Sequence, residues 1–498
     1  MESFGFWAVV PPLLALILAF TTRHVVLSLG VATFTGMLII HGGQPVDALQ
    51  GLLVDGPFTQ LAQGGNAQII VVITIISGFI YLVEQSGGMK AFSQLSTRYI
   101  TSPVKAKLAS WLTGLGIFFT DSGNSLILGP MFAPIFDRLR VSREKLAYII
   151  DSTSSPVCVL VPIISWGVYS QGLIENAFTN LGQKVDGFTV FLQVIPYQLY
   201  PLLALAAIPM YALLNQDWGP MAEAQRAAKE AQQRQLQSQQ QQAAVDISLV
   251  LLPLAALFGT LICLFIYNYG VQGKINGPVI RMSLGSSYVV ATLVAMVLYW
   301  RKRVMTPSQS FNTFLAGMQR ITLILVILLL AWTLGSICKT LGTGDYISQL
   351  LDGRLPIFLV PSLVFVIGAF VSVATGSSWG TFALLIPITV PVAVTLGADP
   401  LVCIGAALSG GLLGDHASPI SDTTILSSMA TGCDHGSHVR TQFPYAILTG
   451  VAACIGFMVA QLTQNPWTVL LALLLQFGLI VVMTRRQRRN EQQQLVTA

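Results

Sequence analysis

Four aspartates could do chemistry because each lies in a short polar stretch that interrupts a long apolar run: Asp121, Asp151, Asp415 and Asp422. A charge at mid-membrane costs about 2.5–3.5 kcal/mol on insertion scales, so such a residue usually binds an ion, carries a proton or pairs with a partner. Burial also favours the protonated form of a carboxyl group. A carboxylate that binds either a sodium ion or a proton, but never both, is the minimal device for exchanging the two.

The residues around these aspartates supply further oxygen ligands. Carboxylates, hydroxyls, amides and freed backbone carbonyls suit a small alkali cation such as sodium, whereas the sulfur and imidazole groups that transition metals prefer are sparse there. The alternative for each aspartate is that it only caps a helix at the break. We expect a site for sodium, protons or a substrate that is formed by Asp121, Ser122, Asn124, Asp151, Ser152, Thr153, Thr375, Ser377, Ser378, Asp415, Ser418, Ser421, Asp422 and Thr423.

The composition of the chain indicates that these residues lie in a lipid bilayer. Of its 498 residues, 53% are hydrophobic and 9% are charged, against about 25% charged residues in soluble domains. This excludes both a soluble protein and a disordered one. The six cysteines are scattered, which argues against a disulfide framework. We find no nucleophile–base pair and no His-Glu-x-x-His motif, and we expect no enzyme activity, no cofactor and no nucleic-acid partner.

Two apolar runs, 106–136 and 356–394, are too long for one span. At 1.5 Å per residue the first would form a helix of about 46 Å, against a hydrocarbon core of about 30 Å. Small polar residues break each run near its middle, at 120–124 and 375–380, and prolines follow each break. We therefore predict two re-entrant helical hairpins, each of which enters the membrane, turns at a polar tip and leaves on the same side.

The basic residues predict the orientation of the chain. The linker 215–245 is expected to be cytoplasmic because it carries Arg226, Lys229 and Arg234. Working outward from it, and provided that both long runs are hairpins, the basic residues left outside are Lys184, Lys274, Arg281, Lys339 and Arg354. The N-terminus then lies outside and the C-terminus in the cytoplasm. Arg320 begins a span, and we expect it to snorkel to the cytoplasmic face.

The two hairpins belong to an internal repeat. When their tips are aligned, Gly123 matches Gly380 and Pro130 matches Pro387. The first hairpin enters from the cytoplasm and the second from outside, so the two halves are inverted. Inverted repeats with broken helices that meet at the midplane are the architecture of secondary transporters.

The predicted fold is therefore an all-α polytopic membrane protein. It has two inverted-topology repeats, each with a re-entrant helical hairpin and a broken transmembrane helix, and a C-terminal extra helix. The predicted parts are a first repeat over 1–214 (hairpin 106–136, broken helix 145–169), a Gln/Ala-rich cytoplasmic linker over 215–246, a second repeat over 247–462 (hairpin 356–394, broken helix 400–427), and an extra transmembrane helix with a basic cytoplasmic tail over 463–498.

Two motifs carry a resemblance to a known family. The runs GDHASPISDTTILSS (414–428) and SREKLAYIIDSTSSPV (142–157) resemble the signatures of NhaC-type sodium/proton antiporters. The resemblance implies the ion-transporter superfamily fold, homodimers built through a scaffold domain, and ion sites at the two hairpin tips with the two broken helices. The sequence departs from the family at the first tip, 120–124, where many relatives have Asp-Asp-Tyr-Ala-Asn, and at Ala133, where an Arg is common.

These observations predict a secondary active transporter in the bacterial inner (cytoplasmic) membrane. We expect it to exchange sodium for protons by alternating access, so that its partners are the lipid bilayer, sodium ions and protons. The alternative is sodium-coupled transport of a small organic acid or amino acid on the same fold. It is motivated by the first tip, because the loss of a carboxylate and a bulky aromatic there could open room for an organic substrate.

Overall fold

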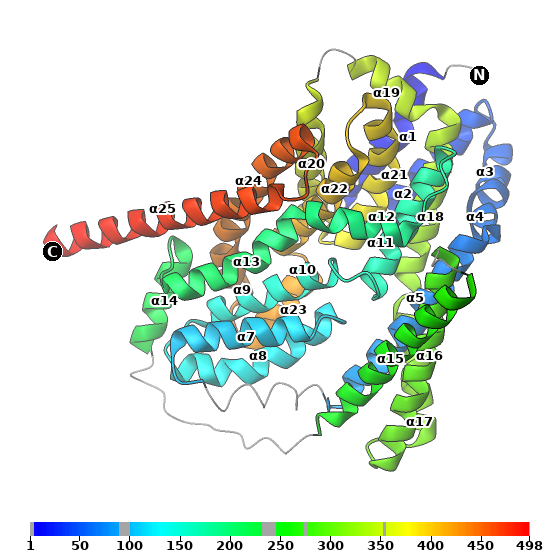
Figure 1. Ribbon diagram of the computed structural model, residues 1–498. Coiled ribbons are helices and arrows are strands. Elements are labelled where there is room, and N and C mark those ends of the chain that lie inside the picture. Colours follow the sequence, from blue (N-terminus) through cyan, green and yellow to red (C-terminus); the bar gives the residue numbers. More distant parts are fainter. Residues whose placement is uncertain (1–3, 89–99, 232–245, 273–276, 352–354, 498) are drawn as a thin grey trace.

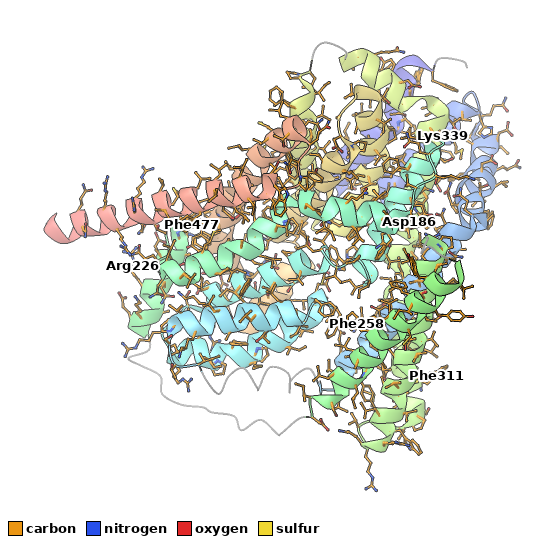
Figure 2. The ribbon with its side chains drawn as sticks, viewed as in Figure 1. Asp186, Arg226, Phe258, Phe311, Lys339 and Phe477 are labelled. Carbon is orange, nitrogen blue, oxygen red and sulfur yellow. The ribbon has the colours of Figure 1, made fainter. Side chains whose placement is uncertain are left out.

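The computed structural model describes residues 4–88, 100–231, 246–272, 277–351 and 355–497. Every element in these residues is a helix, as Figure 1 shows, so the all-α prediction is confirmed. Within the described residues, eight helices are long and apolar enough to cross a membrane, or up to 11 if each bent pair counts as one span. Large apolar side chains on outer helices are exposed, including Phe311 and Phe477 (Figure 2), as expected of a surface that faces lipid.

The first half of the chain begins with several apolar helices, which are followed by a hairpin and a broken helix. Its elements are η1 (Gly5–Val9), α1 (Val10–Thr22), α2 (Val25–Ile40), α3 (Pro45–Leu53), η2 (Val54–Phe58), α4 (Thr59–Ala62), α5 (Gly64–Gln85), α7 (Pro103–Gly116), α8 (Asp121–Arg138), α9 (Arg143–Thr153), α10 (Ser155–Cys158), α11 (Ser165–Asn180), α12 (Gly187–Val194), η3 (Ile195–Tyr197), α13 (Leu199–Leu214) and α14 (Pro220–Ala231).

The second half repeats this order. Its elements are α15 (Ser248–Gln272), α16 (Gly277–Arg301), α17 (Pro307–Arg320), α18 (Thr322–Leu341), α19 (Thr343–Leu351), η4 (Ile357–Leu359), α20 (Val360–Thr375), α21 (Ser378–Leu396), α22 (Pro400–Ala417), α23 (Asp422–Thr431), α24 (His435–Thr463) and the long C-terminal α25 (Thr468–Thr497). The hairpin α7–α8 thus corresponds to α20–α21, and the broken helix after each hairpin corresponds to its counterpart. This confirms the predicted fold class.

Both hairpins turn where a side chain caps the returning helix. Thr120 accepts a hydrogen bond from the Gly123 N–H (3.1 Å), and Ser377 accepts one from the Gly380 N–H (3.3 Å). At the second tip Gly376 has φ +63°, a left-handed conformation that glycine adopts without strain. The two arms of each hairpin pack against each other. The hairpins extend over 103–138 and 360–396, close to the predicted 106–136 and 356–394.

Each hairpin is followed by a broken helix. In the second half α22 ends at Ala417, and after 418–421 the chain resumes as α23, bent by 42°. Pro419 lies in this break, and a proline interrupts a helix because it has no N–H to donate. In the first half the helical parts are α9 and α10, followed by a non-helical stretch at 159–164 and then α11, so this break is wider than in the predicted helix 145–169.

The two halves meet through these elements. Helix α23 of the second half packs against α8 and α9 of the first, and α21 packs against α11. Helix α14 forms part of the predicted linker, and residues 232–245 of the linker lie outside the described residues. So do Arg234, Lys274 and Arg354, which entered the orientation prediction. The division into 1–214, 215–246, 247–462 and 463–498 stays a prediction.

Candidate functional site

Asp415 lies at the end of α22 and is held by two hydroxyl groups. Ser378 of the second tip donates to its Oδ2 (2.8 Å), and Ser421 of the break donates to its Oδ1 (2.8 Å). The side chain is almost fully buried. Because α22 ends here, the carboxylate sits where helical hydrogen bonding stops and other oxygens become available. Ser378, Asp415 and Ser421 thus form one cluster between the hairpin and the broken helix.

Asp422 begins α23 and is exposed. Its Oδ1 accepts a hydrogen bond from the Thr423 N–H (2.9 Å), as expected for an acid in the first turn of a helix. The charges of Asp121, Asp151 and Asp415 act on it across the break. The carboxylates of the two halves are therefore electrostatically linked.

The first tip has a different arrangement. Asp121 accepts hydrogen bonds from the N–H (2.6 Å) and the hydroxyl (3.0 Å) of Ser122. Asn124 is fully buried, and its amide donates to the carbonyls of Gly114 (3.0 Å) and Thr153 (2.9 Å). These carbonyls lie near the ends of α7 and α9. One side chain therefore ties the first arm of the hairpin to the broken helix.

Asp151 lies deeper. Its Oδ2 accepts hydrogen bonds from Thr424 (3.1 Å) on α23 and from the Gln442 amide (2.6 Å) on α24. The next residue, Ser152, shares a hydrogen bond with His416 (2.9 Å), which follows Asp415 in the chain. Asp151 is thus joined to the second half through neutral polar groups.

A cavity of about 470 Å³ lies between the two tips. Six of the sequence-predicted site residues line it: Asp121, Ser122, Ser377, Ser378, Asp415 and Asp422. The others are packed around it without lining it: Asn124, Asp151, Ser152, Thr153, Thr375, Ser418, Ser421 and Thr423. The cavity brings together carboxylates that are separated by about three hundred residues in the sequence.

Several buried oxygens near the cavity have no hydrogen-bond partner among the described residues. They are Asn124 Oδ1, Asp151 Oδ1, Ser155 Oγ, Ser372 Oγ and Thr375 Oγ1. A buried polar atom without a partner costs about 1–3 kcal/mol, so each such atom calls for a water or an ion. All five lie in or near the hairpin tips and the broken helices.

Sequence reasoning missed two charged residues and an aromatic wall of the cavity. Glu84 at the end of α5 accepts a hydrogen bond from the Thr120 hydroxyl (2.5 Å). Arg320, expected to snorkel to the cytoplasmic face, lines the cavity with its guanidinium carbon 3.9 Å from the centre of the Tyr81 ring. The rings of Trp166 and Trp379 lie 4.7 Å apart, centre to centre. The sequence signal that could have identified Glu84 and Arg320 is that each is a charged residue at one end of an apolar run.

Comparison with known proteins gives matches over most of the chain. The model of the Na+/H+ antiporter family matches residues 157–462. A Haemophilus influenzae protein whose name assigns no function is 30% identical over 93% of this chain and 92% of its own. The arginine/ornithine antiporter ArcD of Halobacterium salinarum is 40% identical over 20% of this chain and 21% of its own. The Na+/H+ antiporter NhaC of Alkalihalophilus pseudofirmus is 35% identical over 22% and 26%.

Two solved structures have a similar fold. The YdaH transporter of Alcanivorax borkumensis has a TM-score of 0.57 at 13% identity, over 85% of this chain and 90% of its own. MtrF of Neisseria gonorrhoeae has a TM-score of 0.55 at 16% identity, over 83% and 84%. At these identities the likeness concerns the fold alone.

Proposed function

Because the chain belongs to the Na+/H+ antiporter family, we propose that this multi-pass membrane protein is a secondary active transporter that exchanges sodium ions for protons by alternating access. We further propose that it resides in the bacterial cytoplasmic membrane as a homodimer, with the N-terminus outside and the C-terminus in the cytoplasm. The observation that carries the proposal is the cavity in which Asp121, Asp415 and Asp422 meet between two hairpin tips.

The carboxylates support exchange because they can alternate between two ligands. Asp415 accepts two hydroxyl hydrogen bonds and Asp422 lies at a helix N-terminus, and both arrangements favour a negative charge that sodium can use. A proton that occupies the same carboxyl group removes this charge and releases the ion. Asp151, buried behind the cavity with Ser152 and Thr153, is the proposed carboxylate of the first half.

The oxygens at the tips are the proposed ligands that complete the ion sites. At the first tip these are Asn124 Oδ1 and the Ser122 hydroxyl. At the second, the proposed set consists of Thr375, Ser377, Ser378, Ser418, Ser421 and Thr423. The unpartnered oxygens of Asn124 and Thr375 support this assignment because a sodium ion would give each of them a partner.

The test of exchange is a pH measurement in everted vesicles or proteoliposomes. Added sodium should collapse a preformed pH gradient, and Asp415→Asn and Asp422→Asn should each abolish this response while the protein still inserts. The matched control is Asp47→Asn, because Asp47 is an exposed residue of α3 outside the cavity. Correctly inserted protein that gives no sodium response, or full activity in both cavity variants, would overturn the proposal.

A second candidate function is sodium-coupled transport of a small organic acid or amino acid. The observation that favours it is the size of the cavity, about 470 Å³, since small-molecule sites occupy roughly 300–1,000 Å³ and a bare ion needs far less. The name of the similar ArcD protein, an arginine/ornithine antiporter, also points to amino acids. Uptake of labelled solutes by proteoliposomes, with and without sodium, tests this function, and no accumulation across a broad panel would exclude it.

A further inference from the structure

Arg320 stands out in the cavity because its positive charge faces several negative ones. The other charged residues that line the cavity are Glu84, Asp121, Asp415 and Asp422, all of them acids. We propose that the cavity binds an α-amino acid in its zwitterionic form, with the guanidinium of Arg320 as the group that holds the substrate carboxylate. This inference rests on the transport function proposed for the same cavity and names the substrate class and its recognition residue.

The guanidinium is positioned and has free donors. Its carbon lies 3.9 Å from the centre of the Tyr81 ring, a cation–π contact that fixes the group on one side. Among the described residues, Glu84 is the one acid with a carboxylate oxygen within 4.0 Å of Arg320, and that contact is at the 4.0 Å limit. The other Glu84 oxygen is engaged at 2.5 Å by the Thr120 hydroxyl. The fork of Arg320 is therefore open to a planar carboxylate, which it can bind through two parallel hydrogen bonds.

Exposure supports the same assignment. The Arg320 side chain is 61% exposed, whereas that of Glu84 is 16% exposed. An arginine that served only to neutralise Glu84 would be expected to make a short contact with it and to lose this exposure. The guanidinium instead faces the cavity space, where a ligand can reach it.

The charges of the cavity select a zwitterion over simpler solutes. An organic anion without an amino group could pair with Arg320, but it would face the carboxylates of Asp121, Asp415 and Asp422 with no compensating charge. An amine without a carboxylate could pair with those acids, but it would leave Arg320 unpaired and repelled. An α-amino acid carries both charges on two groups bonded to the same carbon atom, so it can satisfy the base and the acids together.

The remaining wall suits the side chain of such a substrate. Trp166 and Trp379, with ring planes inclined at 50°, form an aromatic surface in the cavity, and Ile324 and Ile327 add apolar contacts. Tyr169 holds the backbone of Trp379 through a hydrogen bond from its hydroxyl to the carbonyl (2.8 Å). The cavity thus combines a few charged groups with apolar walls, as small-molecule sites commonly do.

The test uses the full chain, purified and reconstituted in nanodiscs. Each of the twenty proteinogenic L-amino acids is offered as a tritiated ligand in a scintillation proximity assay with sodium present. For every amino acid that binds, the matching amine without the carboxylate and the matching acid without the amino group are used as competitors. We expect at least one amino acid to bind, and both competitors to be weaker by about tenfold or more, because each lacks one charged contact.

The variants assign the carboxylate contact. Arg320→Gln should weaken amino-acid binding by about tenfold or more, and Arg320→Lys should weaken it less, because lysine keeps the charge but loses the fork. Arg486→Gln, on an exposed position of α25, is the matched control and should bind like the wild type. If Arg320→Gln does not fold, Arg320→Lys alone tests the carboxylate contact, and it should bind the amino acid more weakly than Arg486→Gln does.

Two results would overturn the inference: binding of no amino acid by correctly folded wild type, or unchanged affinity in both Arg320 variants. Sodium-driven pH change is measured on the same purified proteins after reconstitution in proteoliposomes, without any amino acid. A loss of that signal bears on the exchange proposal and leaves the binding assay to decide the amino-acid site, so the two failures can be told apart.

Discussion

At the level of single residues, the breaks in the helices are held by side chains that replace the missing backbone hydrogen bonds. Asn124 shows this most directly, because its amide donates to the carbonyls of both Gly114 and Thr153. Carbonyls near the end of a helix have no partner within it and need one from elsewhere. Asn124 Oδ1 has no hydrogen-bond partner among the described residues, so the residue that ties the first tip together is also a proposed ligand.

Replacing this amide should damage both the tip and the ion site. Asn124→Ala would remove the side-chain hydrogen bond to the buried Thr153 carbonyl, and such a loss costs about 1–3 kcal/mol. The Gly114 carbonyl would lose one of its two donors and keep the Ile117 N–H (3.2 Å). We expect a lower temperature of thermal unfolding in detergent and a weaker apparent affinity for sodium in the exchange assay. The control is Asn268→Ala on α15, whose amide only returns to the Leu264 carbonyl of its own helix. Equal behaviour of the two variants would contradict this role.

A second residue-level feature is the buried ion pair of Lys145 and Asp217. The atoms Lys145 Nζ and Asp217 Oδ1 are 2.6 Å apart, and the side chains are 2% and 7% exposed. The ammonium also lies 4.7–5.3 Å from the ring centres of Tyr148, Tyr211 and Tyr445. The pair joins the start of α9 to the beginning of the linker.

Removing one partner of this pair should be strongly destabilising. Lys145→Met leaves the Asp217 carboxylate buried without its cation, a situation that costs about 3–5 kcal/mol. Lys302→Met is the control, because Lys302 pairs with the exposed Asp246. Hydrogen bonds from Lys302 and Ser248 lower the pKa of Asp246 to about 2. An exposed pair of this kind contributes little to stability. Unfolding in increasing denaturant measures both. Similar losses of unfolding free energy in the two variants would show that burial does not determine how much the Lys145–Asp217 pair stabilises the protein.

The sequence predicted the aspartates and the serines of the tips that line the cavity, but not its aromatic wall or the presence of Glu84 and Arg320. Asp121, Asp415 and Asp422 could be found because an acid inside an apolar run is costly and therefore conspicuous. Trp166 and Trp379 could not, because an aromatic residue in a membrane helix is ordinary and only the packing of α11 against α21 shows what it faces. The sequence did not reveal that Arg320 lines the cavity, because position along the chain does not say which residues a guanidinium faces. Its expected snorkelling to the cytoplasmic face stays a prediction.

At the level of helices, run length and polar tips were enough to predict the two hairpins. The capping residues Thr120 and Ser377 explain where the second arms begin. The extent of the first broken helix could not be predicted from the sequence. The non-helical stretch at 159–164 is Val-Leu-Val-Pro-Ile-Ile, an apolar segment that reads equally well as helix. Tertiary contacts decide such a segment, and periodicity alone cannot.

The close packing of α20 on α22 sets the position of the second tip. Gly410 and Gly414 are spaced as a small-xxx-small motif that lets two helix backbones approach. A methyl group at Gly410 would meet the Phe365 carbonyl, and one at Gly414 would meet the Ala369 carbonyl. These glycines therefore hold the hairpin arm against the helix that carries Asp415.

Alanine at either glycine should push the hairpin away from α22. Gly410→Ala and Gly414→Ala are each expected to cost about 1–3 kcal/mol through overpacking and to reduce sodium-dependent exchange, because Ser378 would move away from Asp415. Gly259→Ala on α15 is the control, since its added methyl group would meet nothing within 4 Å. Exchange and thermal unfolding are measured for all three. Wild-type exchange in both packed variants would mean that this contact does not position the tip.

At the level of the whole molecule, the cavity has a predicted direction. Its lining includes Tyr81 and Glu84 near the end of α5 and Arg320 just before α18. The sequence-based orientation places both of these helix ends toward the cytoplasm. With this orientation we propose that the conformation is the inward-facing one, and alternating access then predicts a second conformation in which the same site faces outward.

Thiol labelling tests the direction and the movement together. In a variant without native cysteines, Ile420→Cys places a thiol at an exposed residue that lines the cavity. We expect a membrane-impermeant maleimide to label it from the cytoplasmic side in inside-out vesicles, and sodium to slow the labelling by about threefold or more if ion binding shifts the population toward the other state. Gln44→Cys, between α2 and α3, should be labelled only from outside. Labelling of Ile420→Cys only from outside would contradict the proposal that the cavity opens toward the cytoplasm. A labelling rate that sodium does not change would argue against ion-coupled alternating access.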